Sequence, residues 1–462
     1  MGRGARGIVG VLRCALLAAL AAASAVSQQS KPASARFVVI APERFAAALA
    51  PYVEAKRKDL PTELVALETA LKGGAADGPA ADDAERLKRY LWEAWRASGV
   101  RYALLVGDAD CLPVRYMVLD RVTAEAANYA FYPCDLYYAD VAKPDGSFDD
   151  WNAKKEGYHA RYFGEVRGEA NKSDFINYDE VDYRPEIAVG RWPVSTAEEA
   201  AAVAKKTLAH DAAIRAAGGA GPRAGLVAID GWVDCKAFMD ARAKELPAGW
   251  SAVKLYSGSA APPDEPHISA LLDEGVGLLL HAGHGYDDGW EGGFSSKAIA
   301  RLKNAERLPV VMSAGCSTAR FATLPPYEAY LDADGVEHKG TTHGEKFDAP
   351  PPPPHCYQTG KYNLSGLGEK MLRAPNGGAV AYIGCNTGSQ PAALTLMKGF
   401  TAALGRAGEP HPRLGDLWSS SLANYFDAEH LADLKPNADW YPPSIFFQGM
   451  KFMCFGDPTV RM

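Results

Sequence analysis

The stretch "LPVVMSAGCSTARF", residues 308–321, joins a buried strand to a reactive side chain. Its apolar run, Leu308 to Met312, is typical of a strand that is covered on both faces of a sheet. A Ser-Ala-Gly turn ends the run, and Cys316 follows at once. We therefore expect this thiol either to be packed or disulfide-bonded, or to be a nucleophile held at the end of a strand.

A second stretch, "VGLLLHAGHG" at residues 276–285, has the same design and delivers His281 and His284. His284 precedes Cys316 by 32 residues, about the length of one strand–helix–strand unit. Neighbouring parallel strands place their carboxyl ends at one edge of the sheet, where open α/β sheets bind ligands. We therefore expect His284 to come close to Cys316.

The rest of the chain alternates in the same way. Apolar strand candidates occur at 36–42, 100–108, 186–194, 224–230, 251–256, 276–283, 308–315 and 377–384. Helical patterns occur at 82–99, 195–217, 233–245, 266–274, 296–305, 364–373 and 391–405. This alternation predicts an α/β protein with mostly parallel strands, in two sheet-bearing regions joined near residues 195–222.

Two of these helices carry start signals. Asp82 and Glu85 have the spacing of a capping box, and Gly99 supplies the stop of the same helix. Ser195 and Glu198 repeat that spacing at the start of the helix predicted for 195–217.

The first residues have the pattern of a targeting segment. Three arginines precede a short apolar run at 15–26, and Ala-Ser-Ala or Ala-Val-Ser then fits a cleavage site. We predict a signal peptide at 1–27 and a secreted or periplasmic protein. No later stretch is long and apolar enough for an integral membrane segment. Removal of 1–27 takes the net charge from −7 to −10 and leaves no basic cluster, which argues against nucleic acid as a partner.

The length of the mature chain, about 435 residues, suggests two or three domains. We expect a smaller N-terminal α/β subdomain at 28–199 and a larger one at 200–462. The Pro-rich stretch 322–362 reads as a surface insertion that is partly polyproline II. Seven cysteines follow residue 27, so at least one thiol is unpaired within the chain, while the other six leave several disulfide pairings open.

A pair of Cys316 and His284 has a clear chemical rationale. The thiolate is the nucleophile, and a nearby imidazole takes its proton and later protonates the leaving amine. The small residues in both turns let a substrate approach the backbone closely. The N–H groups of Gly285 and Cys316 are then natural donors for an oxyanion hole.

In these residues the chain resembles the gingipain family of cysteine peptidases, within the caspase-like clan CD. The resemblance is carried by "LLLHAGHG" (278–285) and "VVMSAGC" (310–316), and also by "YALLVGDADCLP" (102–113), "PEIAVGRWPVSTAEEA" (185–200) and "FGDP" (455–458). It covers roughly residues 36–462.

The resemblance implies a caspase-like αβα sandwich with a mostly parallel sheet, and an exported cysteine endopeptidase that acts on proteins or peptides. It maps the catalytic dyad onto His284 and Cys316, and a supporting carboxylate onto Glu186. The chemistry of such a dyad requires no cofactor.

Other interpretations remain open from the sequence. The fold could serve as a gingipain-like scaffold without turnover, used for binding or assembly. His281 and His284 could instead be two ligands of a metal-dependent hydrolase. Three acids in the Asp-rich region, Asp135, Asp140 and Asp149, are candidate ligands for a structural Ca²⁺ ion.

Overall fold

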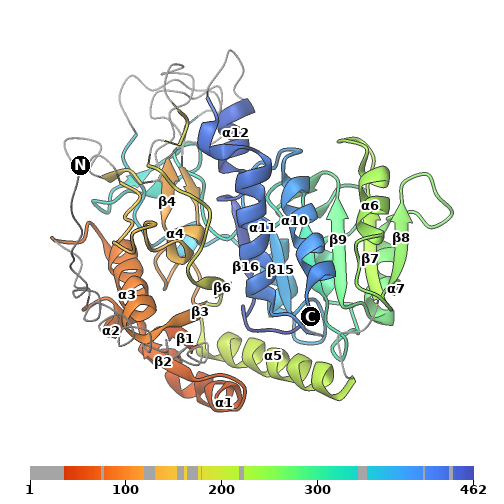
Figure 1. Ribbon diagram of the computed structural model, residues 1–462, viewed down its shortest axis with the longest axis horizontal. Coiled ribbons are helices and arrows are strands. Elements are labelled where there is room, and N and C mark those ends of the chain that lie inside the picture. The colour runs from red at the N-terminus through yellow and green to blue at the C-terminus, as the bar shows by residue number, and fades with distance from the viewer. Residues whose placement is uncertain are drawn as a thin grey trace, which may run out of the picture. The chain divides into compact units, whose positions relative to one another are not determined.

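The structure is a computed structural model of the 462-residue chain. It describes residues 36–73, 78–118, 131–152, 161–163, 175–177, 179–217, 223–341, 351–408, 411–435 and 441–462. Residues 1–27, for which a signal peptide is predicted, lie outside these ranges. Residues 35–462 form one compact unit, whose centre is a ten-stranded sheet (Figure 1).

The strands of the central sheet have the order β2-β1-β3-β6-β16-β15-β12-β9-β7-β8. Their bounds, in chain order, are β1 Arg36–Ala41, β2 Thr62–Ala66, β3 Val100–Val106, β6 Ala188–Trp192, β7 Arg223–Ala228, β8 Ser251–Tyr256, β9 Leu278–Ala282, β12 Val310–Ser313, β15 Ala381–Cys385 and β16 Phe452–Phe455. The pairings β2–β1–β3–β6 and β15–β12–β9–β7–β8 are parallel, whereas β16 runs antiparallel to β15.

The helices are α1 Ala46–Lys56, α2 Leu67–Ala70, α3 Asp83–Ser98, α4 Leu136–Ala139, α5 Ala197–Ala217, α6 Cys235–Ala243, α7 Glu265–Glu274, α8 Ser296–Ile299, α9 Leu367–Arg373, α10 Ala393–Arg406, α11 Leu414–Ala428 and α12 Tyr441–Gln448. Three small two-stranded antiparallel sheets pair β4 (Tyr116–Val118) with β5 (Phe131–Pro133), β10 (Gly285–Tyr286) with β11 (Gly289–Trp290), and β13 (Tyr330–Leu331) with β14 (Glu337–His338).

Helices cover both faces of the sheet and form two separate cores. Along β1, Val38 and Ile40 point into one core, while Phe37 and Val39 point into the other. This alternation follows from the two-residue period of a strand. The first core lies under α3, α6, α10 and α11, and the second under α1, α5 and α7, all labelled in Figure 1. Helix α9 also packs on the second core, through Leu367 and Met371. The three layers confirm the predicted αβα class with a mostly parallel sheet.

Strands from both predicted regions share this one sheet. The junction is β16, which pairs with β15 and places Phe455 opposite Arg191 of β6. The strands β16 and β2 and the helices α1 and α11 were not predicted from the sequence. The helix predicted at 296–305 is shorter than predicted, because α8 ends at Ile299.

The two predicted helix starts have different outcomes. At α3, the Asp82 carboxylate accepts from the N–H of Glu85 at 2.9 Å, and Gly99 takes a left-handed conformation, so this start and stop are confirmed. At α5, the prediction of Ser195 with Glu198 is wrong by one residue. There the Thr196 hydroxyl accepts from the N–H of Glu199, whose carboxylate accepts from the N–H of Ser195 at 2.9 Å.

The predicted surface insertion at 322–362 begins in the interior instead. Within its described parts, 322–341 and 351–362, the side chains of Leu324 and Tyr330 are fully buried. The β13–β14 hairpin follows, and Gln358 ties the returning chain to Leu331. Although residues 322–362 are rich in proline, the first part of this segment packs in the protein interior.

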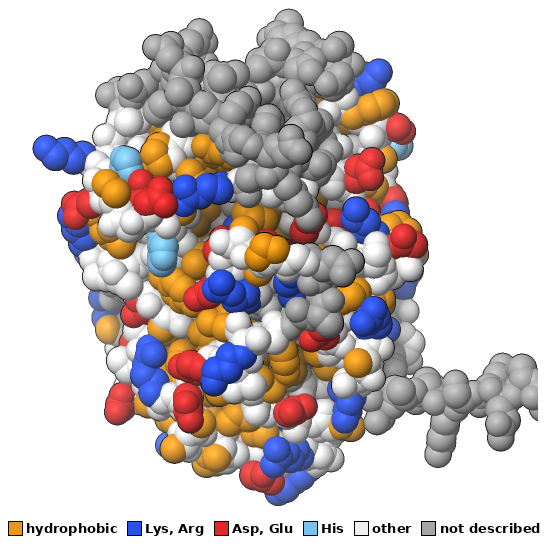
Figure 2. All heavy atoms as spheres, turned by 90° about the vertical axis from the view of Figure 1, so that its left-hand side faces the viewer, with side chains coloured by type: hydrophobic (Ala, Val, Ile, Leu, Met, Phe, Trp, Pro, Cys, Tyr) orange, Lys and Arg blue, Asp and Glu red, His pale blue; other side chains and the backbone are white. Residues whose placement is uncertain are grey.

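One face of the molecule mixes charges of both signs. On the face shown in Figure 2, Lys and Arg side chains alternate with Asp and Glu side chains, without a broad area of one sign. Among the helices that the structure describes, none is long and apolar enough to cross a membrane.

Candidate active site

The His284 turn and the Cys316 turn leave neighbouring strands at the same edge of the sheet. His284 follows the end of β9, and Cys316 follows the end of β12. These strands pair in parallel, with His281 opposite Ser313, so their carboxyl ends lie side by side. Cys316 is half-buried, whereas the other six cysteines of the described residues are buried, and all seven are free thiols.

The two turns pack backbone against backbone. A Cβ atom placed on Gly285 would lie 2.9 Å from the carbonyl oxygen of Cys316. A Cβ placed on Gly315 would lie 3.0 Å from the Cα of Gly285. Only glycine leaves room for this approach, which brings together the two peptide groups predicted to form an oxyanion hole.

The imidazole of His284 is oriented by a third strand. Its Nε2 atom lies 3.0 Å from the carbonyl oxygen of Gly231, just beyond β7, the strand on the other side of β9. A carbonyl oxygen only accepts, so this contact places the proton on Nε2 and leaves the Nδ1 lone pair available. This half-buried ring can therefore take a proton at Nδ1.

The sulfur of Cys316 meets a turn that follows β15. The backbone N–H of Ser389 donates to Sγ at 3.2 Å, and Sγ lies 3.7 Å from the carbonyl oxygen of the same residue. The Cys316 turn is fixed to this segment, because Ser317 donates its N–H to Thr387 at 2.7 Å. Ser317 has a φ of 57°, a conformation that costs free energy outside glycine and concentrates at functional sites.

His281 has a different environment from His284. It is fully buried, its Nδ1 lies 2.9 Å from the Ser313 hydroxyl, and its ring stacks on Trp290 with centroids 4.3 Å apart. Burial lowers the pKa of His281 to about 3, so the ring is neutral. No group of three His, Cys, Asp or Glu side chains within the described ranges is arranged to hold a metal ion. The geometry thus gives no support to a metal centre on His281 and His284.

Glu186 lies against a loop of the N-terminal region. Its carboxylate accepts from the N–H groups of Val141 and Ala142, at 2.9 and 3.2 Å. Burial raises the pKa of Glu186, although these two donors oppose the shift. The acceptor that meets the His284 ring is Gly231, so the supporting role of Glu186 stays a prediction.

The three acids predicted as calcium ligands have separate surroundings. Asp135 uses both carboxylate oxygens to bind Arg191, at 2.7 Å each. Asp140 is buried, and burial raises its pKa well above the ordinary value. Asp149 accepts from the N–H of Trp151. Because Asp135 is already neutralised by a guanidinium group, these residues do not fit a shared calcium site.

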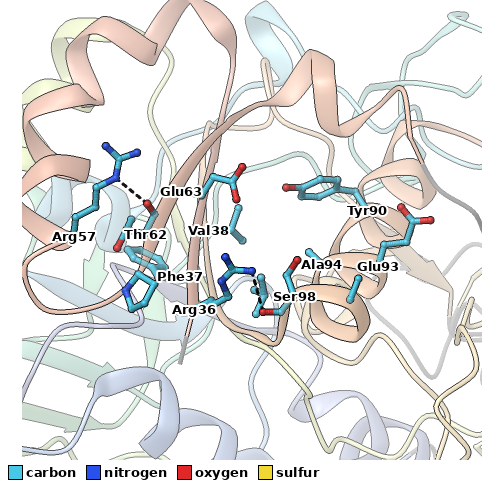
Figure 3. Close-up of a pocket in the computed structure, with 13 residues that line it drawn as sticks. Arg36, Phe37, Val38, Arg57, Thr62, Glu63, Tyr90, Glu93, Ala94 and Ser98 are labelled. Atoms are coloured by element: carbon cyan, nitrogen blue, oxygen red, sulfur yellow. Dashed lines mark hydrogen bonds between the residues drawn. The ribbon is translucent and has the colours of Figure 1, made fainter. Parts of the chain in front are cut away.

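A large hollow lies away from both turns. It has a volume of about 660 Å³ and is lined by the start of β1, by β2 and by one side of α3 (Figure 3). Arg36, Glu63, Tyr90 and Glu93 border it, as the close-up shows. None of its lining residues belongs to the His284 or Cys316 turn.

Comparison with known proteins identifies the family of this chain. The model of Peptidase family C25 matches residues 30–462. This chain belongs to Peptidase family C25. It is therefore a cysteine peptidase, and its substrates are proteins or peptides. The gingipain resemblance predicted from the sequence is confirmed.

Solved structures share the fold of this C25 peptidase. The Arg-specific cysteine proteinase gingipain R is 15% identical, with a TM-score of 0.58, over 94% of this chain and 79% of that one. The complex of the RgpB pro- and mature domains from Porphyromonas gingivalis is 16% identical, with a TM-score of 0.56, over 92% and 79%. A structure described as a protease has 16% identity and a TM-score of 0.53, over 92% and 78%. No curated protein sequence matches the chain.

Sequence reasoning missed the groups that hold the two turns of this C25 peptidase. Gly231 and Ser389 act through backbone atoms, which carry no signature in the side-chain pattern. One signal was present: both residues follow apolar strands that were predicted, at 224–230 and 377–384, so they lie at the same edge of the sheet as Cys316.

Proposed function

We propose that this C25 peptidase is an exported endopeptidase with Cys316 as nucleophile and His284 as its acid–base partner. The observation that supports this most directly is the contact between the two turns, at Gly285 and Gly315, beside a half-buried free thiol. The family supplies the reaction, which is hydrolysis of a peptide bond by a cysteine.

The reaction begins when the Cys316 thiol loses its proton to the Nδ1 atom of His284. The thiolate then attacks the scissile carbonyl carbon, and the carbonyl oxygen becomes an oxyanion. Backbone N–H groups of Gly285 and Cys316 donate to that oxyanion. In other enzymes one such donor stabilises the transition state by about 3 kcal/mol. The imidazolium next protonates the leaving amine, which departs and leaves a thioester on Cys316.

Water completes the cycle. The neutral His284 ring takes a proton from a water molecule, which attacks the thioester carbonyl and releases the second product. The bond from Nε2 to Gly231 keeps the ring in the tautomer that both steps need. In this proposal Glu186 holds the loop at Val141 and has no direct contact with the His284 ring, whose partner is Gly231.

Substitution of the nucleophile tests this proposal. Cys316→Ala should lower hydrolysis of an unfolded protein substrate by at least about a thousandfold, because the covalent route is lost. Cys111→Ala is the matched control, since that buried thiol lies 3.5 Å from the Val194 carbonyl and belongs to neither turn. Full activity in Cys316→Ala would refute the assignment. A wild-type protein that neither cleaves a broad peptide library nor reacts with electrophilic peptide probes would instead be a scaffold.

Export has its own test. The proposed signal peptide at 1–27 predicts that the protein recovered outside the cytoplasm begins after Ala25 or Ser27. N-terminal sequencing of that fraction checks the position. A chain that keeps Met1 and stays in the cytoplasm would contradict export and leave the dyad unaffected.

A further inference from the structure

A buried lysine lies behind the turn that contacts the nucleophile. Lys451 immediately precedes β16, whose start pairs with the end of β15, and it is only 3% exposed. Its ammonium group donates to the carbonyl oxygen of Gly388 at 2.6 Å. A buried cation costs free energy unless it has a partner. Among the described residues, the hydrogen-bond acceptor of the Lys451 ammonium is this backbone carbonyl and not a carboxylate.

Lys451 and Cys316 bind opposite ends of the same peptide group. The carbonyl of Gly388 and the N–H of Ser389 belong to one planar unit, and in a trans peptide they point in opposite directions. Lys451 binds the oxygen, and the N–H donates to the Cys316 sulfur at 3.2 Å. A cation on the oxygen draws electron density through the amide and makes the N–H a stronger donor.

The turn that carries this peptide is held in place by further bonds. Gln448 accepts from the N–H of Gln390 at 2.8 Å and donates to the Ser389 hydroxyl at 3.1 Å. The carbonyl of Lys451 accepts from the N–H of Asn386 at 2.9 Å. The Ser389 N–H is therefore fixed toward the sulfur before any substrate arrives.

The other groups around the ammonium of Lys451 are a second thiol, Cys385, and an aromatic ring. Lys451 faces Cys385 and Cys316, and its ammonium lies 5.7 Å from the centroid of the Tyr132 ring. Burial raises the pKa of Cys385 to about 11, so that thiol stays neutral. Burial also lowers the pKa of Lys451, whereas negative charge on Cys385 or Cys316 raises it.

We propose that Lys451 is a positioning residue that stabilises the thiolate of Cys316 through the Gly388–Ser389 peptide. This inference deepens the proposed function and rests on Cys316 as the nucleophile. In the thiol form, the S–H donates toward the Ser389 carbonyl at 3.7 Å. In the thiolate form, the sulfur accepts from the Ser389 N–H, and the charge of Lys451 makes that bond stronger. The proton released by Cys316 goes to His284 or to solvent.

Alkylation of Cys316 measures this effect without any need for turnover. We compare the rate at which iodoacetamide modifies Cys316 in the wild type and in Lys451→Met, from pH 5 to pH 10, by peptide mass spectrometry. Loss of the cation should slow alkylation about tenfold at neutral pH, because less of the thiol is ionised. The two rates should converge at high pH, where Cys316 is ionised in both proteins.

Lys206→Met is the matched control. Lys206 is half-buried, and it donates to backbone carbonyls of Met371, Leu372, Ala374 and Gly377 at 2.6 to 3.0 Å. These residues surround the end of α9 and precede β15, away from the Cys316 turn. Lys206→Met should therefore lose stability while the pH profile of Cys316 alkylation stays that of the wild type.

Two further variants keep the inference open to refutation. Lys451→Arg retains the charge and should keep alkylation within about threefold of the wild type. Lys451→Gln retains a donor without the charge and should react slowly, and it replaces Lys451→Met if that variant does not fold. Superimposable profiles for the wild type and the uncharged variants would overturn the role of Lys451. That result would leave the peptidase proposal standing, whereas an active Cys316→Ala would remove the proposed nucleophile itself.

Discussion

Gly285 and Gly315 lie in direct backbone contact, so that a Cβ atom on Gly315 would come within 3.0 Å of the Gly285 Cα. One glycine follows His284 and the other precedes Cys316. The spacing between the proposed acid–base group and the proposed nucleophile is thus set by the absence of two side chains. Catalysis by a positioned pair is sensitive to shifts of about 1 Å, so this contact is open to test.

Gly285→Ala should separate the two turns and lower kcat/KM by about a hundredfold. The added methyl group would meet the Cys316 carbonyl oxygen at 2.9 Å and the Thr318 side chain at 2.7 Å, so the backbone has to move. Gly73→Ala is the control, because a Cβ there meets no atom within 4 Å. Peptide hydrolysis and thermal unfolding of both variants check the prediction. Equal kcat/KM in Gly285→Ala and Gly73→Ala would show that the spacing of the turns does not matter.

His281 should make the fold sensitive to mild acid. Burial lowers its folded-state pKa to about 3, well below its ordinary value of about 6.5. Between these values only the unfolded chain takes up the proton, so stability falls as the pH falls. From pH 7.5 to pH 5 this residue should account for about 2 kcal/mol of lost stability. Urea titrations of the wild type and His281→Phe at both pH values measure it, and equal losses in the two proteins would contradict the prediction.

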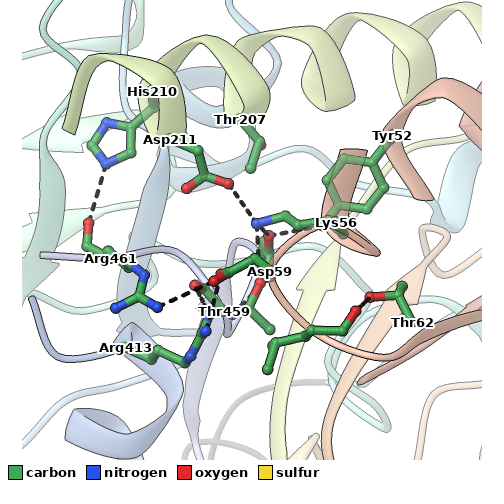
Figure 4. Close-up of polar contacts among 12 residues, drawn as sticks. Tyr52, Lys56, Asp59, Thr62, Thr207, His210, Asp211, Arg413, Thr459 and Arg461 are labelled. Atoms are coloured by element: carbon green, nitrogen blue, oxygen red, sulfur yellow. Dashed lines mark hydrogen bonds and ion pairs between the residues drawn. The ribbon is translucent and has the colours of Figure 1, made fainter. Parts of the chain in front are cut away.

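A buried ion network at the opposite edge of the sheet should stabilise the fold without affecting the site. The ammonium of Lys56 lies 2.6 Å from both Asp211 and Asp457, and Tyr52 donates to Asp457 at 2.7 Å. Figure 4 shows Lys56 between Tyr52, Asp211 and Thr459. Asp457 follows β16, which runs antiparallel to β15, so it lies at the edge where β15 and β12 begin.

Asp457→Asn should lower the free energy of unfolding by about 3 to 5 kcal/mol, because one partner of a buried ion pair is lost. Asp427→Asn removes an exposed partner of Arg184 and should cost under about 1 kcal/mol. Urea unfolding gives both values. Folded Asp457→Asn should keep the kcat/KM of the wild type, and a large loss of kcat/KM would show that the network reaches the site.

The same network gives a pH dependence with a defined sign. Burial alone would raise the pKa of Asp457, but attraction to Lys56 and hydrogen bonds hold it below its ordinary value. Its contribution is therefore present above about pH 4 and is lost as the pH falls further. The difference in stability between wild type and Asp457→Asn should shrink in that acid range. A difference that stays constant down to pH 2 would contradict this account.

Glu186→Gln should act mainly on stability. The carboxylate holds the N–H groups of Val141 and Ala142, and its replacement by an amide should cost about 1 to 2 kcal/mol. Because Gly231 is the acceptor on the His284 ring, kcat/KM of the folded variant should stay within about threefold of the wild type. A loss of more than tenfold with an altered pH profile would instead favour the direct support of His284 that the gingipain resemblance implies.

Much of the fold was predictable because the main strands are apolar on both faces. β8 has the bounds predicted for it, and both ends of β1, β3 and β7 lie within about two residues of their predicted positions. β15 ends within one residue of its predicted end but starts at Ala381, later than predicted. β16 was missed because "FMCF" is only four residues long, too short for a period to show. The predicted capping box of α5 was off by one residue. Ser195 and Thr196 are both good N-cap residues, and Glu198 and Glu199 lie three residues after them, so the sequence did not distinguish the two pairs.

The candidate site was predictable as far as side chains at strand ends reveal it. His284 and Cys316 follow predicted apolar strands, and the parallel pairing of those strands brings their turns together. The roles of Gly231 and Ser389 were not predictable, because both act through backbone groups, although their place after predicted strands was a signal. Lys451 was not predictable because the strand that follows it, β16, had been missed. The ion pair of Asp135 with Arg191 was not predictable for a related reason, since composition alone does not show which acids are already paired, and the calcium ligands stay a prediction.

The central claim is that Cys316 and His284 act on one substrate. Covalent trapping tests this claim most directly. A peptidyl chloromethyl ketone that inhibits the enzyme should form one adduct, on Cys316, and hydrolysis should fall in proportion to the fraction labelled. His284→Ala should label at least about a hundredfold more slowly at neutral pH. A stoichiometric adduct on another residue, or full hydrolysis with Cys316 modified, would contradict the account.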